Sequence, residues 1–300
     1  METLPQLDRY SSPDLEPIIV DPAAELTEGP VWDARRNRLL WVDISRGLVE
    51  ESDWATGTRR TWHTGGFVGS AVPRAGGGLV IADGLGFAFL DEDTAAPVER
   101  IASILPAGHR MNDGACDPEG CFWAGSMAVD ARQGAGALYR LSREGAVEKM
   151  LDGLTISNGL AWSRRQSRMY FVDSGTNGVD FFDWHGVGLL GDRRRFVAIP
   201  SAEGVPDGIT IDREDCLWVA LWDGWSVRRY SPDGELICSI ELPVAQVTSC
   251  AFGSPDLGDL YITTAAHNLS AADREAQPLA GTVFRVRPGV SGLPTPDFEG

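Results

Sequence analysis

The pentapeptide LeuLeuTrpValAsp occupies residues 39–43, and segments of the same character recur through the chain. Each consists mainly of β-branched, aromatic or other apolar residues, which are typical of buried strands. The other five are LeuValIleAlaAsp at 79–83, CysPheTrpAlaGly at 121–125, MetTyrPheValAsp at 169–173, CysLeuTrpValAla at 216–220 and LeuTyrIleThrThr at 260–264. Their central residues lie 40 to 48 positions apart, so the sequence contains six copies of one structural unit.

Each unit has the pattern of a small antiparallel sheet. A polar turn precedes most of the pentapeptides, as in AspProGluGly at 117–120, and a short strand such as GlyProValTrp at 29–32 precedes each turn. A third strand follows, for example GlyAlaLeuTyrArgLeu at 136–141. Three or four strands with this period are typical of propeller blades. The sequence therefore predicts an all-β protein, a single six-bladed β-propeller with four-stranded blades.

The repeats also predict the domain organisation. Six units between residues 28 and 287 leave no room for a second domain, and 35 Gly and 18 Pro residues disfavour long helices. We expect residues 1–24 to form an N-terminal extension with a closing strand, and residues 25–300 to form one catalytic propeller domain. ProIleIleVal at 17–20 belongs to no repeat, and we expect it to close the ring beside ThrValPheArgVal at 282–286.

Composition excludes several classes of partner. The 300 residues include 43 acidic and 26 basic side chains, a net charge of −17, which disfavours nucleic acids and anionic lipid surfaces. No run approaches the roughly 20 apolar residues of a membrane helix, and the N-terminus lacks a basic segment followed by an apolar one. Five cysteines cannot all pair, although a Cys116–Cys121 disulfide stays possible. We expect a cytoplasmic protein that is a monomer or a weak homo-oligomer.

One position of the repeat predicts a functional site. The first strand of each blade lines the central channel, so equivalent residues point at one axis. Counting back five residues from the start of each turn gives the set Glu28, Val68, Asn112, Asn158, Asp207 and Ser249. Five of these six side chains carry oxygen. Two carboxylates held together there would repel each other and lose hydration, and a bound cation offsets both costs.

The nature of the donors narrows the choice of cation. Carboxylate and carboxamide oxygens are hard ligands that suit Ca²⁺, Mg²⁺ or Mn²⁺, and Zn²⁺ remains an alternative because Asp and Glu can bind it. Of these ions we expect Ca²⁺. A second interpretation remains open, in which the polar side chains only satisfy backbone groups around a water-filled channel.

Six motifs then point to a known family. They are GluGlyProValTrpAsp at 28–33, ArgMetAsnAspGly at 110–114, AlaGlySerMet at 124–127, SerAsnGlyLeuAlaTrpSer at 157–163, ProAspGlyIleThrIleAsp at 206–212 and AlaGlyThrValPheArgVal at 280–286. In this order they closely resemble the gluconolactonase, regucalcin (senescence marker protein) and luciferin-regenerating-enzyme family, from about residue 25 to residue 290. The resemblance implies a six-bladed propeller with one divalent metal at its axis, and a lactonase for sugar acids.

The resemblance also implies roles for individual residues. By motif, the metal ligands fall on Glu28, Asn158 and Asp207, and the substrate contacts fall on Arg110 and Asn112. Some family members have an acidic substrate contact after the AlaGlySerMet strand, and Asp130 is the candidate here, although the following loop is shorter than in vertebrate relatives.

Three further features near these motifs stay open to two interpretations. We expect Asp113 to support its turn or to orient Arg110. His109 precedes Arg110 and could reach the rim of the pocket. LeuTrpAspGlyTrp at 221–225 either forms an aromatic wall of the pocket or belongs to the strand core.

These features predict a divalent-metal-dependent lactonase for a small aldonolactone such as gluconolactone. Asp207 could both hold the ion and accept a proton from water, and Arg110 offers a planar fork for sugar hydroxyls or a developing carboxylate. No GlyXaaSerXaaGly motif for a nucleophilic serine occurs. The alternatives are a phosphotriesterase-like metal hydrolase, a non-catalytic ion-binding propeller, or a propeller recruited to a specialised biosynthetic step that opens or forms a ring.

Overall fold

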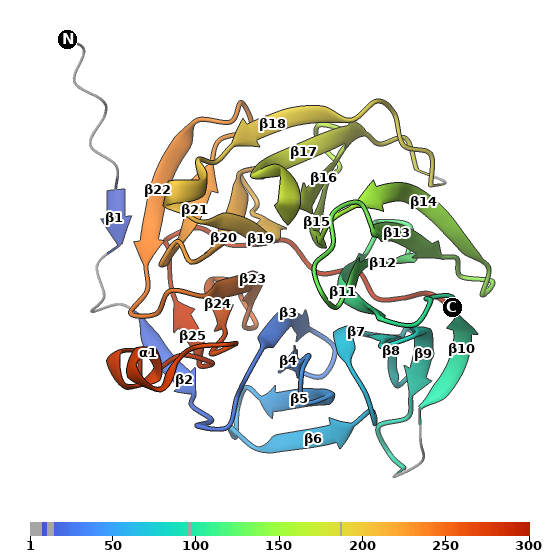
Figure 1. The fold of residues 1–300 in the computed structure, drawn as a ribbon, viewed down its shortest axis with the longest axis horizontal. Coiled ribbons are helices and arrows are strands. Elements are labelled where there is room, and N and C mark those ends of the chain that lie inside the picture. Colours follow the sequence, from blue (N-terminus) through green and yellow to red (C-terminus); the bar gives the residue numbers. More distant parts are fainter. Residues whose placement is uncertain (1–7, 11–14, 95–97, 187) are drawn as a thin grey trace.

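The strands form six sheets arranged radially around one axis in a computed structural model, which describes residues 8–10, 15–94, 98–186 and 188–300 (Figure 1). The predicted six-bladed, all-β propeller is therefore confirmed. The first three blades, from the axis outward, are β3 (Thr27–Asp33), β4 (Arg38–Asp43), β5 (Leu48–Asp53) and β6 (Arg59–His63); β7 (Val68–Pro73), β8 (Leu79–Asp83), β9 (Gly86–Leu90) and β10 (Glu99–Ser103); and β11 (His109–Cys116), β12 (Phe122–Ala128), β13 (Gly136–Leu141) and β14 (Val147–Leu154).

Blades 4 to 6 continue the same order around the ring. They are β15 (Ser157–Ser163), β16 (Arg168–Asp173), β17 (Gly178–Asp183) and β18 (Arg194–Ala198); β19 (Val205–Ile211), β20 (Leu217–Trp222), β21 (Ser226–Tyr230) and β22 (Leu236–Glu241); and β23 (Val247–Gly253), β24 (Asp259–Thr264), β25 (Val283–Val286) and β2 (Glu16–Ile19). The short elements outside the sheets are α1 (Ala271–Ala276), which Ser270 caps, and the 3₁₀ turns Ser174–Thr176 and Ser201–Glu203. Among the described residues, no helix has the length and apolar composition to cross a bilayer.

The ring closes as the sequence predicts. Strand β2 lies antiparallel to β25, with Pro17 opposite Phe284 and Ile19 opposite Val283. Blade 5 has five strands instead of the predicted four, because β1 (Asp8–Tyr10) pairs with β22 in parallel. No repeat pattern extends to these three residues, so the sequence does not predict this strand.

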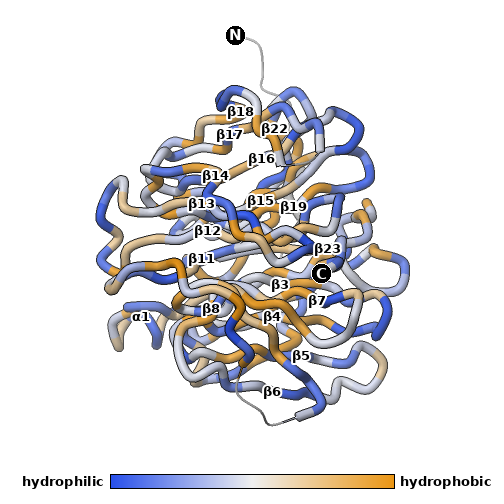
Figure 2. Tube along the Cα trace, turned by 90° about the vertical axis from the view of Figure 1, so that its right-hand side faces the viewer, coloured by the Kyte–Doolittle hydropathy of each residue, from blue (hydrophilic) through white to orange (hydrophobic). Residues whose placement is uncertain are grey.

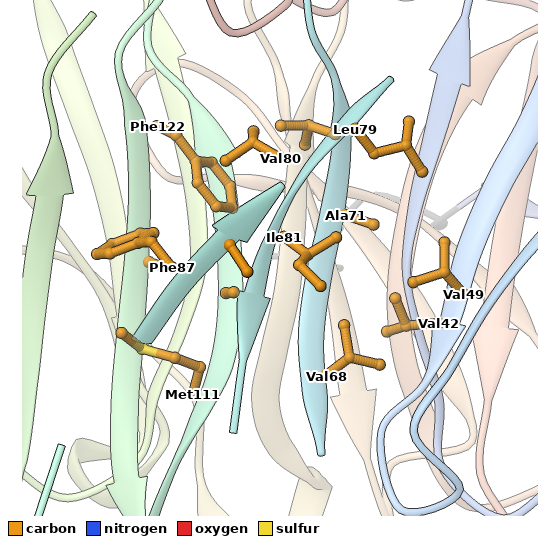
Figure 3. Packing of buried hydrophobic residues seen from close by; sticks show 14 of the residues in the cluster. Val42, Val49, Val68, Ala71, Leu79, Val80, Ile81, Phe87, Met111 and Phe122 are labelled. Atoms are coloured by element: carbon orange, nitrogen blue, oxygen red, sulfur yellow. The ribbon is translucent and has the colours of Figure 1, made fainter. Parts of the chain in front are cut away.

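The core lies between neighbouring blades. Figure 3 shows Val42 and Val49 of blade 1 facing Val68 and Ala71 of blade 2, and this cluster continues into blade 3 through Met111. Hydrophobic residues concentrate in the strands, and hydrophilic residues are frequent in the loops at the edges of the molecule (Figure 2). The apolar pentapeptides are the second strands of the blades, buried on both faces, which explains their continuous apolar character.

Buried tryptophans tie the second strands to nearby carboxylates. The indole N–H of Trp123 donates to Asp117 at 2.8 Å, and that of Trp218 donates to Asp212 at 2.9 Å. Trp41 instead donates to Glu50 at 2.8 Å. A buried indole N–H needs an acceptor, so these bonds allow the large rings to fill the space between blades.

The innermost strands share an irregularity that positions the site. In every blade the pairing of the first strand with the second shifts register near the start of the first strand, as between Glu28 and Val31 in β3 and between Pro206 and Ile209 in β19. A bulge of this kind re-aims a side chain. Five of the six residues selected by the repeat alignment lie at or within this shift, and Ser249 lies at its end.

Glycines beside these bulges bring the inner strands together. A Cβ on Gly159 would lie 2.7 Å from the carbonyl oxygen of Asp207, and one on Gly69 would lie 2.7 Å from that of Asn112. Since no larger residue fits, the backbones of adjacent blades approach closely at this level, and the ring around the axis is narrow.

The C-terminal tail, residues 287–300, crosses the face that carries the turns between first and second strands. The backbone N–H of Arg213 in blade 5 donates to Ser291 at 2.9 Å, Phe298 donates to Pro73 in blade 2 at 2.9 Å, and Glu299 donates to Gly120 in blade 3 at 2.9 Å. Figure 1 shows this segment passing behind β19 and β11 to the C-terminus near β9 and β10.

Candidate functional site

Two buried carboxylates form the centre of the site at the bulges of β3 and β19. Glu28 is 4% exposed and Asp207 is 5% exposed. Burial raises the pKa of Glu28 well above its usual range, and the nearby charges of Asp207 and Asp113 raise it further. Burial likewise raises the pKa of Asp207, Asp113 adds to the effect, and Asn158 and Arg110 oppose it. The site therefore brings together acidic groups whose ionised forms the protein alone does not stabilise.

Asn158 completes this centre from the bulge of β15. Its Nδ2 donates to Ser174 Oγ at 3.0 Å, and Ser174 Oγ donates in turn to the carbonyl of Pro206 at 2.8 Å. This arrangement leaves Asn158 Oδ1 buried without a hydrogen-bond partner, and Asp207 Oδ1 is in the same condition. Buried oxygens without partners are rare in folded proteins, so two of them at one site call for a bound group.

The residues present fit a divalent cation. Carboxylate oxygens from Glu28 and Asp207 and the amide oxygen of Asn158 are hard donors, and an ion would satisfy both orphaned oxygens. In the part of the chain that the structure describes, no group of three or more His, Cys, Asp or Glu side chains is placed to hold a metal. An ion at this point thus depends on the Asn158 amide as its third protein ligand.

Arg110 and Asn112 lie beside the carboxylates on β11. Arg110 Nη1 donates to Asn112 Oδ1 at 2.7 Å and to the carbonyl of Met111 at 3.0 Å, and Asn112 Nδ2 donates to the carbonyl of Ser157 at 3.0 Å. Burial lowers the pKa of Arg110 to about 10, while Glu28 and Asp207 act in the opposite direction. Arg110 thus remains cationic at neutral pH, and Asn112 holds its guanidinium in place.

Asp113, which the sequence predicts to support its turn or to orient Arg110, also belongs to the functional centre. Its Oδ1 accepts the N–H of Gly114 at 2.6 Å, which agrees with a role in supporting the backbone. Burial raises the pKa of Asp113 to about 6, and its charge acts on both Glu28 and Asp207. It is thus a third acidic group of the centre.

Asp130 is not brought into this group. It lies on the loop between β12 and β13, its carboxylate is exposed, and its Oδ1 lies 4.0 Å from Arg132 Nε. No described contact of Asp130 reaches the carboxylates or Arg110. Its role as a substrate contact stays a prediction.

A second layer of the site was missed from the sequence. The ring of His267 packs edge-on against Trp222 with centroids 6.4 Å apart, and Gln246 Nε2 donates to the carbonyl of His267 at 3.0 Å. Burial lowers the pKa of His267, and Arg110 lowers it further, which places this imidazole near Arg110. His267 Nδ1 and Gln246 Oε1 are buried and have no hydrogen-bond partner among the described residues.

These contacts also bear on two features that the sequence left open. In the segment 221–225, Leu221 and Trp222 differ in role, because Leu221 is core whereas Trp222 is partly exposed beside His267. His109, at the start of β11, has its ring Nδ1 3.3 Å from the carbonyl of Ala107.

Comparisons with known proteins agree with the motifs. Residues 26–266 match the model of a family described as the SMP-30/Gluconolactonase/LRE-like region. The chain is 38% identical to regucalcin from Danio rerio, over 92% of this chain and 95% of the relative, and 33% identical to pentonolactonase XacC from Haloferax volcanii, over 92% and 95%. A solved structure of a calcium-binding protein, regucalcin, from Agrobacterium tumefaciens superimposes with a TM-score of 0.87 at 28% identity, covering 93% of this chain and 96% of that one.

Proposed function

The chain belongs to the SMP-30/gluconolactonase/LRE-like family, and from this premise we propose that it is a divalent-metal-dependent lactonase that hydrolyses a small aldonolactone such as gluconolactone. One observation carries the proposal. The orphaned oxygens of Asn158 and Asp207 lie with Glu28 in a buried acidic centre, and the cationic Arg110 lies beside it. A relative over most of the chain is named a pentonolactonase, which supports a sugar lactone as the substrate class.

Glu28, Asn158 and Asp207 are the residues that would hold the ion. Ca²⁺ is the first candidate because all three donors are hard oxygens and because the Agrobacterium relative is described as calcium-binding. Mg²⁺, Mn²⁺ and Zn²⁺ are the alternatives. The chemistry that such an ion supplies is polarisation of the lactone carbonyl and activation of water.

Asp207 is the proposed general base. Besides holding the ion, its carboxylate would accept a proton from the water molecule that attacks the lactone carbonyl. Glu28 and Asp207 are only 4% and 5% exposed, which limits competition from bulk solvent at the carboxylates.

Arg110 is the proposed substrate clamp. Its guanidinium can donate to the sugar hydroxyls and to the carboxylate that forms when the ring opens. Because Asn112 accepts from Arg110 and donates to Ser157, the guanidinium is already held before substrate binds, which reduces the entropy lost on binding. Asp130 is proposed as a further substrate contact from its loop.

The test compares metal-free and metal-loaded protein on the same lactones. Protein stripped with a chelator and then reloaded with Ca²⁺ is assayed on gluconolactone and on pentonolactones by acid release, with spontaneous opening subtracted. We expect hydrolysis to depend on the ion, and equal rates for the two forms would refute the proposal. A neutral phosphotriester in the same panel distinguishes the phosphotriesterase alternative, since that substrate offers Arg110 no hydroxyl or carboxylate.

We propose a cytoplasmic location for this enzyme. The five cysteines, all of them among the described residues, are buried and form no disulfide, which suits a reducing compartment. Fractionation of the source cells, with the protein followed by antibody, tests the location.

A further inference from the structure

A cavity of about 520 Å³ occupies the propeller axis beyond the proposed ion site. Glu28, Asn158 and Asp207 do not line it. It begins at Ser249, their equivalent on β23, and at residues that follow the aligned positions on the other inner strands, such as Gly29 and Asp113. It extends to the turns at the far ends of these strands. We call it the far cavity. Its volume falls in the range of pockets that hold small organic ligands.

The wall of the far cavity is mostly apolar. It includes the second halves of the inner strands, among them Val31, Leu160, Ile209 and Ala251. Thr210 is the partly exposed residue between two buried isoleucines of β19, and it also lines the space. A polyhydroxylated lactone has little apolar surface to bury in such a space and would gain little binding free energy there. The far cavity therefore suits a ligand with an apolar body.

The C-terminal tail crosses the mouth of the far cavity. Residues 293–296, LeuProThrPro, line it, and the chain is fixed on both sides of them. The N–H of Gly292 donates to Leu257 at 2.8 Å, and that of Phe298 donates to Pro73 at 2.9 Å. Within 293–296 no backbone hydrogen bond occurs between described residues, and two of the four residues are prolines.

Three arginines without carboxylate partners gather at this mouth. Most of the arginines whose side chains the structure describes form an ion pair with a carboxylate within 4.0 Å. Six of them do not, and Arg164, Arg165 and Arg213 are three of these six. All three line the far cavity and are exposed. Arg164 donates to the carbonyl of Pro118 at 2.6 Å, whereas the guanidinium groups of Arg165 and Arg213 contact no described acceptor.

Three buried aspartates also line the cavity, Asp113, Asp212 and Asp215, and none of them forms an ion pair within 4.0 Å with these arginines. Asp212 accepts from Trp218 and pairs with Arg229 at 2.7 Å, and Asp215 accepts from the hydroxyl of Ser163 at 2.7 Å. The chain has a net charge of −17, so a cluster of arginines without carboxylate partners is unusual in it. Such a cluster at the opening of an apolar cavity matches an anionic head group with an apolar body.

We propose that the far cavity binds an organic carboxylate with an apolar body, such as a medium-chain fatty acid. Its carboxylate lies at Arg165 and Arg213, and its chain lies along Leu160 and Ile209. The cavity adjoins the proposed ion centre at Asp113, but Glu28, Asn158 and Asp207 do not line it, and the proposal does not depend on the lactonase assignment.

The first test uses sodium octanoate as the probe, titrated into the full-length protein by calorimetry below its micelle concentration. Octanol and octylammonium have the same chain with a neutral or a cationic head. We expect saturable binding of one octanoate per chain, about tenfold weaker binding of octanol, and no binding of octylammonium. The absence of saturable octanoate binding, or equal affinity for octanoate and octanol, would overturn the proposal.

The second test locates the site with matched variants. We expect Arg165→Gln combined with Arg213→Gln to weaken octanoate binding about tenfold, whereas Arg194→Gln, on the outer strand of blade 4, leaves it unchanged. Thr210→Phe fills the far cavity and is expected to abolish binding, while Thr210→Val keeps the volume and the binding. Unchanged affinity in a folded Thr210→Phe variant would show that octanoate binds elsewhere and would refute the proposed site.

Discussion

The hydroxyl of Ser174 receives a hydrogen bond from the Asn158 amide at 3.0 Å, and this contact decides which end of the amide stays free. Because the nitrogen is engaged, the carbonyl oxygen is the group left without a partner. Ser174 itself is held by donating to Pro206, one residue before Asp207. One side chain of a 3₁₀ turn therefore orients a proposed metal ligand and contacts the strand that carries another.

Replacement of Ser174 tests this role. We expect Ser174→Ala to weaken Ca²⁺ binding about 10- to 100-fold, because the Asn158 amide loses the bond that fixes its orientation. Calorimetric titration of the metal-free protein measures the effect. Ser201→Ala, in the exposed 3₁₀ turn Ser201–Glu203, is the control and is expected to bind normally. A Ser174→Ala variant with unchanged affinity would remove Ser174 from the site.

Asp207→Asn is expected to have opposite effects on the stability of the metal-free protein and on its activity. We expect this variant to lose hydrolysis and most metal affinity, because a carboxylate ligand and the proposed base are both removed. We also expect the metal-free variant to be more stable than the metal-free parent, by about 1–3 kcal/mol, since a buried uncompensated charge is gone. Urea unfolding with a chelator present measures this, and a loss of stability would contradict the charge crowding inferred for Glu28 and Asp207. Glu28→Gln is expected to behave in the same way.

Arg110→Ala is expected to act on substrate and not on metal. We expect kcat/KM for gluconolactone to fall about 100-fold, because a charge-assisted contact to the substrate is lost. Affinity for Ca²⁺ is expected to stay the same or to increase, since a nearby positive charge is removed. Parallel kinetics and metal titration give the answer, and a variant that no longer binds the ion would contradict the assigned role.

Trp41 tests the packing between blades. We expect Trp41→Ala to reduce the free energy of unfolding by about 3–5 kcal/mol, because a fully buried indole is removed and Glu50 loses its donor. Trp54→Ala is the control, because that side chain is 46% exposed and its loss is expected to cost far less. Chemical denaturation of both variants provides the comparison.

Two deletions test the contribution of the N-terminal strands. Removal of residues 1–14 takes away β1, which adds three residues to an already complete blade, and we expect a small effect on the melting temperature. Removal of residues 1–20 also takes away β2 and exposes the edge of β25, so we expect a much larger loss of stability and a tendency to aggregate. Similar melting temperatures for the two truncated chains would show that the pairing of β2 with β25 does not stabilise the propeller.

Much of the architecture could be predicted because the blades repeat. The recurring pentapeptides located the second strands, and the inner-strand alignment gave Glu28, Asn158 and Asp207 among its six residues, since equivalent positions of the repeat fall at equivalent bulges. The resemblance to the family then singled out these three as the proposed ligands. Strand β1 could not be predicted, because three residues carry no periodicity and their pairing depends on an edge that the folded blade provides.

The supporting residues of the site were harder to find for a physical reason. Ser174 and His267 follow the second strands of blades 4 and 6, in segments whose lengths differ between repeats, so no alignment places them. Asp113 lies one residue beyond the aligned Asn112, and only the register shift within β11 explains why it too acts on the central carboxylates.

The path of the C-terminal tail has a consequence for how the propeller unfolds. Repeated units that contact only their neighbours can open one at a time. Here residues 287–300 link blades 5 and 6 directly to blades 2 and 3 across the ring, so disruption of any of these blades must also detach the tail from the others. We therefore expect heating to produce one cooperative transition in place of a stepwise loss of blades.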